Sequence, residues 1–229
     1  MNPKGAPGQY LQRTVSALIM ATPWCLIPRF GMSFRCCIEA SHGGATVLAR
    51  RKIQARVAPC ALLIVGPKRD KALSVGLTPE AYYRTLEARA TPDLPPYEEW
   101  LAAGRFIDLH GQGHPIHMVI EAHHAGHRVL IDLTLAQVNK TSAGELSVPL
   151  AMPWYDTEGW PEVEMNDGTQ IIYLPCPYPD KIPSEARNYK NKDLADDFDA
   201  TMPIALKCDL DPVRFLATMR PRLGTLVGE

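Results

Sequence analysis

The sequence lacks the residue spacings of the commonest metal sites. Its six cysteines include no Cys-x-x-Cys pair, and its seven histidines form no His-Glu-x-x-His motif. These patterns are typical of structural zinc sites and of zinc peptidases, so their absence argues against both classes. A net charge of −1 also leaves no large basic field. We therefore expect no nucleic acid or anionic membrane as a partner.

The sequence also lacks an apolar run long enough to cross a bilayer. Residues 10–20 are the most apolar part of the N-terminus, but they are too short and too polar for a membrane span. No convincing signal-peptide cleavage site follows them. Adjacent Cys36 and Cys37 make a poor disulfide framework, which favours a reducing compartment. We expect a soluble cytoplasmic protein.

No internal repeat or low-complexity tract divides the chain. Its length can bury one substantial core, and its 21 prolines predict long ordered loops. We expect a single domain over residues 1–229. Its functional core would cover about 30–137, with an N-terminal helix at 9–21 that breaks before Pro23 and an extension at 138–229.

The hydrophobic periodicity predicts an α+β fold, in which a central N-terminal helix packs on an antiparallel β-sheet. Helices are expected at 33–51 (with Ser33 as the N-cap), 78–90, 95–103 and for about ten residues from Asp211-Pro212. Strands are expected at 53–65, 115–121, 128–134, 163–165 and 169–174. Residues 66–77 look like a polar loop, and the acidic cluster 193–199 looks like a solvated face or a loop.

Two glycines and one proline lead to further predictions about packing. Gly43 and Gly44 lie inside the predicted central helix, where each costs about 1 kcal/mol relative to alanine. They therefore indicate a kink or the close approach of another backbone. Pro59 indicates that its strand has an edge or a bulge there.

The strands at 115–121 and 128–134 place a histidine and an acid on one face. Side chains alternate along a strand, so His117 shares a face with Glu121, and Asp132 shares a face with Arg128. A turn around residues 124–125 would set His117 directly opposite Asp132 and Glu121 opposite Arg128.

A turn at Ala125-Gly126 has the better turn chemistry. In that register the histidine and the aspartate are diagonal neighbours on the same face.

A cysteine at a helix start completes a possible catalytic set. Unpaired backbone N–H groups stabilise a thiolate there, a histidine can take the proton, and a carboxylate can orient the histidine. Cys37, His117 and Asp132 are our candidates. Cys36 is the rival nucleophile and His114 the rival base. The alternative interpretation of Cys37 is a small buried hydrophobic residue.

An acyl-transfer site also needs an oxyanion donor besides the cysteine backbone N–H. Upstream candidates are Trp24, Gln9 and Gln12, although tryptophan is more often a core residue. Gln137 could bound the pocket or cap the strand exit. Glu39 could tune the site or lie on the helix surface.

Four segments resemble the transglutaminase-like and arylamine N-acetyltransferase branches of the papain-like cysteine-enzyme superfamily. Residues 37–40 resemble the nucleophile segment, and residues 53–57 resemble the Gly-Ile-Pro-Ala-Arg stretch that enters the next strand. Residues 113–119 and 130–134 resemble the histidine and aspartate strands. The resemblance covers roughly 30–137.

The resemblance implies a papain-like fold and a Cys-His-Asp triad that forms a thioester intermediate. The expected activity is peptidase, deamidase or transglutaminase-like amidase, without a cofactor or metal. Its substrate would be a protein, a peptide or a small amide or thioester.

Two other functions stay open. Six of the seven histidines fall between residues 110 and 127, and clustered histidines can bind metal. A papain-like scaffold can also serve as a non-catalytic binding module.

Overall fold

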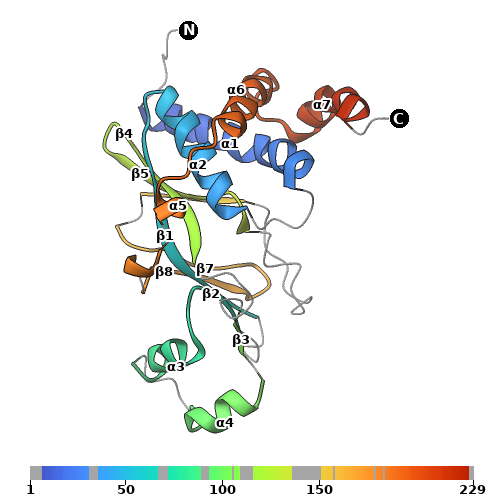
Figure 1. Cartoon of the computed structure of the whole chain (residues 1–229). Coiled ribbons are helices and arrows are strands. Elements are labelled where there is room, and N and C mark those ends of the chain that lie inside the picture. The colour runs from blue at the N-terminus through green and yellow to red at the C-terminus, as the bar shows by residue number, and fades with distance from the viewer. Residues whose placement is uncertain are drawn as a thin grey trace.

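A computed structural model describes most of the chain (Figure 1). The described residues are 7–30, 36–66, 72–88, 93–104, 106–108, 116–135, 151–156, 158–177, 179–182 and 184–226. The helices are α1 (Pro7–Phe30), α2 (Cys37–Arg50), α3 (Pro79–Ala88), α4 (Tyr97–Ala102), the 3-10 turn η4 (Pro179–Lys181), α5 (Ser184–Arg187), α6 (Lys192–Lys207) and α7 (Pro212–Leu226). The strands are β1 (Gln54–Val65), β2 (Ala72–Val75), β3 (Phe106–Asp108), β4 (His117–His124), β5 (His127–Asp132), β6 (Met152–Tyr155), β7 (Glu162–Glu164) and β8 (Gln170–Pro175).

The fold mixes helices with one curled, mainly antiparallel sheet, as the sequence predicts. Strand β1 is its longest member and pairs with β4 over residues 54–60 and with β8 over residues 60–65. Strands β5 and β6 continue the sheet beyond β4, while β2 pairs with β1 and, in parallel, with β3. Pro59 precedes the segment of β1 that pairs on both sides, which confirms the predicted edge position.

The β4–β5 hairpin adopts the second of the two expected registers. Glu121 pairs with Leu130, and Ala125 and Gly126 form a two-residue turn with φ of 49° and 86°. The register around residues 124–125 is therefore wrong. Two left-handed residues give a turn whose twist matches that of the strands, and glycine adopts this conformation at little cost.

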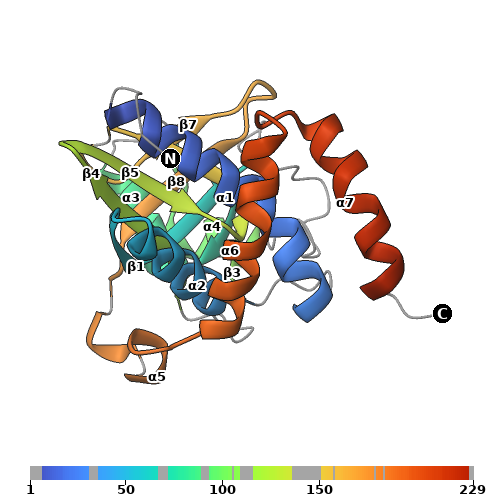
Figure 2. The same ribbon diagram turned by 90° about the horizontal axis from the view of Figure 1, so that it is seen from above.

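Helices α1 and α2 pack on the sheet at β4, and α6 packs on both of these helices (Figures 1 and 2). Helix α1 runs through Pro23, so the expected break before that residue is wrong. Its buried face continues past the proline with Cys25 and Leu26, and this packing against α6 outweighs the lost hydrogen bond. Helix α2 begins at Cys37 with Cys36 as its N-cap, so the expectation that Ser33 caps this helix is wrong.

The two glycines of α2 lie where other elements approach closely. A Cβ on Gly44 would lie 2.6 Å from Ile120 Cδ1 and 2.8 Å from Leu133 Cδ1, while one on Gly43 would lie 3.0 Å from Leu194 Cγ. The approach expected from the sequence is confirmed, but the neighbours are side chains of the sheet and of α6 rather than a backbone.

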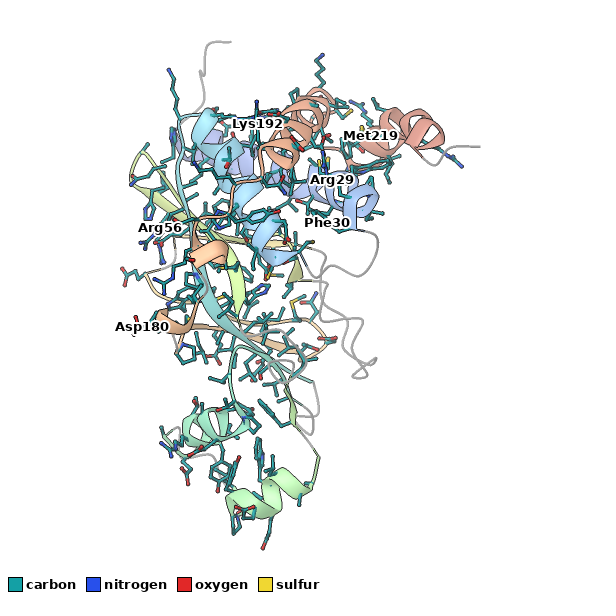
Figure 3. The ribbon with its side chains drawn as sticks, in the orientation of Figure 1. Arg29, Phe30, Arg56, Asp180, Lys192 and Met219 are labelled. Carbon is teal, nitrogen blue, oxygen red and sulfur yellow. The ribbon has the colours of Figure 1, made fainter. Side chains whose placement is uncertain are left out.

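The acidic cluster at 193–199 belongs to helix α6 rather than to a loop. Its apolar face buries Leu194, Phe198 and Met202, and its acids face basic residues of α1 and α2. The ion pairs are Arg29–Asp197 at 2.5 Å (Arg29 is labelled in Figure 3), Arg50–Asp196 at 2.7 Å, Arg50–Asp199 at 2.6 Å and Arg51–Asp199. Such exposed pairs contribute little stability, so the apolar face holds the helix in place.

Helices α3 and α4 lie at the opposite end of the sheet from α1, α2 and α6 (Figure 1). Tyr82, Tyr83 and Trp100 pack there against β1, β2 and β8. The predicted loop at 66–77 contains buried strand β2, which four residues are too few to reveal from periodicity. Helix α7 begins at Pro212 as predicted but is longer than expected. Among the described residues, no helix is long and apolar enough to cross a membrane.

Candidate active site

His117 and Asp132 form a buried pair across the β4–β5 hairpin. His117 Nε2 lies 2.7 Å from Asp132 Oδ2, and both side chains are fully buried. The hairpin register makes them diagonal neighbours on the face that also carries Cys60 of β1. The sequence therefore placed both residues on the correct face.

Asp132 is held by three donors from three segments. Besides His117, the Tyr173 hydroxyl of β8 donates to Oδ2 at 2.6 Å, and the Thr134 backbone N–H donates to Oδ1 at 2.8 Å. Tyr173 is itself buried and packs edge-on against Trp154. The sequence does not single out Tyr173, because its place on the inward face of a predicted strand is the only local signal of a role.

Cys37 is the first residue of α2, and its thiol hydrogen-bonds the His117 imidazole. His117 Nε2 is engaged by Asp132, so Nδ1 is the ring nitrogen that can face the thiol. The thiol is partly exposed, and it lies at a helix N-terminus whose unpaired N–H groups favour negative charge. The structure thus brings the three predicted residues together.

The pKa of His117 is raised to about 10. Burial alone would lower this pKa, but the adjacent Asp132 carboxylate and hydrogen bonds to Asp132 and Cys37 outweigh it. An imidazole of this basicity can hold a proton taken from a thiol, since an ordinary thiol has a pKa of about 8.5.

Cys36 lies in a different environment from that of Cys37. It is 1% exposed and lies in the helical core with α1 and α6. Burial, helped by the charges of Glu39 and Cys37, raises its thiol pKa to about 12. A reactive thiol needs access and a proton acceptor, so the geometry favours Cys37 over Cys36.

The proposed oxyanion and pocket residues fall in different places. Trp24 packs edge-on against Phe215 of α7, at a ring separation of 6.0 Å, in the helical core. Glu39 is half-buried in the first turn of α2, where its charge acts on Cys36. Glu39 is therefore close to the cysteine pair, whereas Trp24 supports the core.

The remaining candidates are either exposed or undescribed. Gln9 and Gln12 are exposed on α1. His114 and Gln137 lie outside the described residues, so their predicted roles stay predictions.

Two of the three histidines at the hairpin tip lie beside acids, and the third, His124, packs against the Tyr10 ring. His123 lies 3.2 Å from Glu121, and His127 lies 3.3 Å from Asp156. Across the described part of the chain, no group of three or more His, Cys, Asp or Glu side chains is arranged to hold a metal ion.

A cavity of about 300 Å³ shares lining residues with the apolar cluster on which Cys37 packs. It lies between α2, β1, β4 and the segment from η4 to α5. Cys37 packs against a small cluster formed by Ile116, Met118, Ile182 and Ala186, and the last three of these also line the cavity. A molecule in this cavity would therefore lie against the cluster that supports the thiol.

Comparisons with protein-family models, with curated proteins and with solved structures find no match to this chain.

Replacing Tyr173 with phenylalanine should weaken the site without dismantling it. Without the phenol, the Asp132 charge acts more strongly on the imidazole, so the pKa of His117 should rise further. The imidazole is already protonated at pH 7, so this rise by itself should not change the rate. The carboxylate also loses one of the three donors that fix its position, and we expect Cys37 to be alkylated about tenfold more slowly, because a less firmly held Asp132 orients the imidazole less well toward the thiol. NMR titration of the His117 ring and iodoacetamide kinetics measure the two effects.

Tyr83→Phe is the matched control for this variant. It removes another buried tyrosine's hydroxyl, one that donates to the Pro95 carbonyl at 2.7 Å. Equal behaviour of the two variants would show that Tyr173 has no role in positioning Asp132.

Proposed function

We propose that this protein is a cysteine-dependent acyl-transfer enzyme in which Cys37 is the nucleophile, His117 the general acid-base and Asp132 the orienting carboxylate. One observation carries the proposal: a partly exposed thiol at a helix N-terminus hydrogen-bonds an imidazole that is buried against a carboxylate. The cysteine on a helix, followed by histidine and aspartate on adjacent strands, also supports a papain-like, transglutaminase-like fold.

The chemistry follows from these positions. His117 takes the thiol proton, and Cys37 Sγ attacks the carbonyl carbon of an amide or a thioester. The S–C bond forms as the carbonyl π electrons move to oxygen, and the backbone N–H groups at the start of α2 stabilise the oxyanion. When the oxyanion collapses, the bond to the leaving amine or thiol breaks, and His117 returns its proton to that group.

A thioester between Cys37 and the acyl group remains. Water or an amine attacks it, its proton passes to His117, and the S–C bond breaks to restore the Cys37 thiolate. Asp132 stays ionised throughout and stabilises the imidazolium. The same steps serve a peptidase, a deamidase or a transglutaminase-like amidase.

In this proposal the protein works without a cofactor, and its compartment is the reducing cytoplasm. All six cysteines are free thiols, and four of them are buried. The substrate in this proposal is a protein, a peptide or a small amide or thioester.

Intact-mass trapping of the acyl-enzyme tests the proposal. The protein is mixed with a panel of p-nitrophenyl esters and acyl thioesters, quenched in acid and weighed. We expect an acyl adduct on the wild type and on Cys36→Ser, but none on Cys37→Ser. No adduct on the wild type, or an adduct that survives in Cys37→Ser, would contradict the assignment.

A further inference from the structure

The cavity next to the cluster that supports Cys37 has an apolar floor. Its apolar lining comes from β1, β4 and the segment from η4 to α5, and consists of Val57, Pro59, Met118, Pro179, Ile182 and Ala186. Its volume of about 300 Å³ lies at the lower end of the range for small-molecule sites. Such a space suits one medium-sized apolar side chain with the backbone atoms beside it.

Two nitrogen-bearing side chains also line the cavity. His42 Nε2 lies 2.9 Å from the Ala186 carbonyl oxygen, which ties α2 to α5. The exposed Arg187 donates from Nη2 to the Pro179 carbonyl. A guanidinium has five N–H donors in a planar fork that suits a carboxylate, and a single carbonyl cannot use them all.

Asp180 lies on the same segment as this arginine. Asp180 of η4 is exposed, and Figure 3 shows it at the outer margin of the molecule. The cavity thus combines an apolar floor with a cationic rim.

We propose that this cavity binds an apolar residue of the substrate that carries a free carboxylate, as in an N-acylated leucine or the C-terminal leucine of a peptide. The apolar side chain fills the space between Met118, Ile182 and Ala186, and Arg187 binds the carboxylate. This inference rests on the proposed function, because it assigns the group that follows the carbonyl attacked by Cys37.

Three alkylating probes, each resembling the proposed ligand more closely than the one before, measure the preference of the cavity for an apolar group with a carboxylate. They are iodoacetamide, N-isopentyl-iodoacetamide and N-iodoacetyl-leucine. In each case Cys37 Sγ bonds to the methylene carbon as the C–I bond breaks and iodide leaves. Relative to free cysteine, we expect Cys37 to react about tenfold faster with the isopentyl probe than with iodoacetamide. We expect a further tenfold gain with the leucine probe, since about 1.4 kcal/mol of binding corresponds to a factor of ten.

Two variants separate the apolar and ionic contributions. Arg187→Gln should remove only the gain that comes from the carboxylate, while Ala186→Phe should fill the cavity and remove both gains. Ala200→Phe, at an exposed position of α6, is the matched control and should keep both. Arg187 is also exposed, so its replacement should leave the fold intact.

The outcomes distinguish this inference from the proposed function. If Cys37 reacts with all three probes at equal relative rates, the cavity assignment is wrong and the nucleophile assignment stands. If iodoacetamide does not label Cys37, the proposed function is wrong. The cavity is then judged by NMR titration of Cys37→Ser with N-acetyl-leucine, where absence of saturable shifts at Met118 and Ile182 overturns it.

Discussion

Asp132→Asn is expected to slow the alkylation of Cys37 by a factor of about 10²–10⁴, the range for loss of general acid-base assistance. The reason lies in the two opposing effects on His117. Burial lowers its pKa, and the carboxylate raises it to about 10. Without the carboxylate, burial prevails, so the imidazole should be neutral at pH 7. A neutral imidazole gives the thiolate no positive partner. Iodoacetamide kinetics at pH 7 and NMR titration of the His117 ring measure both consequences.

Asp156→Asn is the matched control for this variant. Asp156 also pairs with a histidine, His127, but this pair is exposed at 3.3 Å, and solvent screens it. The control should change neither the reactivity of Cys37 nor the fold. Unchanged reactivity in Asp132→Asn would show that the buried pair is structural rather than catalytic.

Phe198→Ala is expected to lower the free energy of unfolding by about 3–5 kcal/mol, the usual cost of removing a buried aromatic ring. Phe198 is fully buried on the apolar face of α6, where α6 packs on α1 and α2. The cavity left behind would loosen the support of the helix that carries Cys37. Urea unfolding followed by circular dichroism gives the value.

Leu216→Ala provides the comparison. Leu216 is also a large apolar residue on a C-terminal helix, but it is 53% exposed, so its truncation should change stability by only about 0.5 kcal/mol or less. Similar losses for the two variants would mean that α6 does not pack as described.

The sequence predicted the parts of the site that depend on local periodicity. Alternation along two short strands placed His117 and Asp132 on one face, and turn chemistry at Ala125-Gly126 indicated the register. Both follow from neighbours within about fifteen residues of one another. The start of the central helix near Cys37 was predictable for the same reason.

The sequence did not reveal the contacts that arise from distant segments. Tyr173 reaches Asp132 from 41 residues away, through the pairing of β8 with β1. The cavity lining from α5 joins α2 across a larger gap of 144 residues, through the contact of His42 with Ala186. Local patterns carry no information on such long-range contacts, because these contacts depend on how the sheet curls.

Local signals failed where packing is strong. Pro23 predicted a helix break, and the acidic residues of 193–199 indicated a solvated face or a loop but not that they belong to a helix whose apolar face includes Phe198. In both places the burial of side chains at helical spacing outweighed the local signal.

The pH dependence of Cys37 alkylation tests the central claim most directly. Iodoacetamide labelling is followed from pH 5 to 11 by peptide mass spectrometry, with Cys176, another partly exposed thiol, as the internal reference. A raised pKa keeps His117 protonated up to about pH 10, so the imidazolium should support a reactive thiolate throughout the neutral range. We predict that near neutral pH Cys37 reacts at least tenfold faster than Cys176, because the His117 imidazole takes up the thiol proton of Cys37. Equal rates at the two cysteines, rising together above pH 8, would contradict the account.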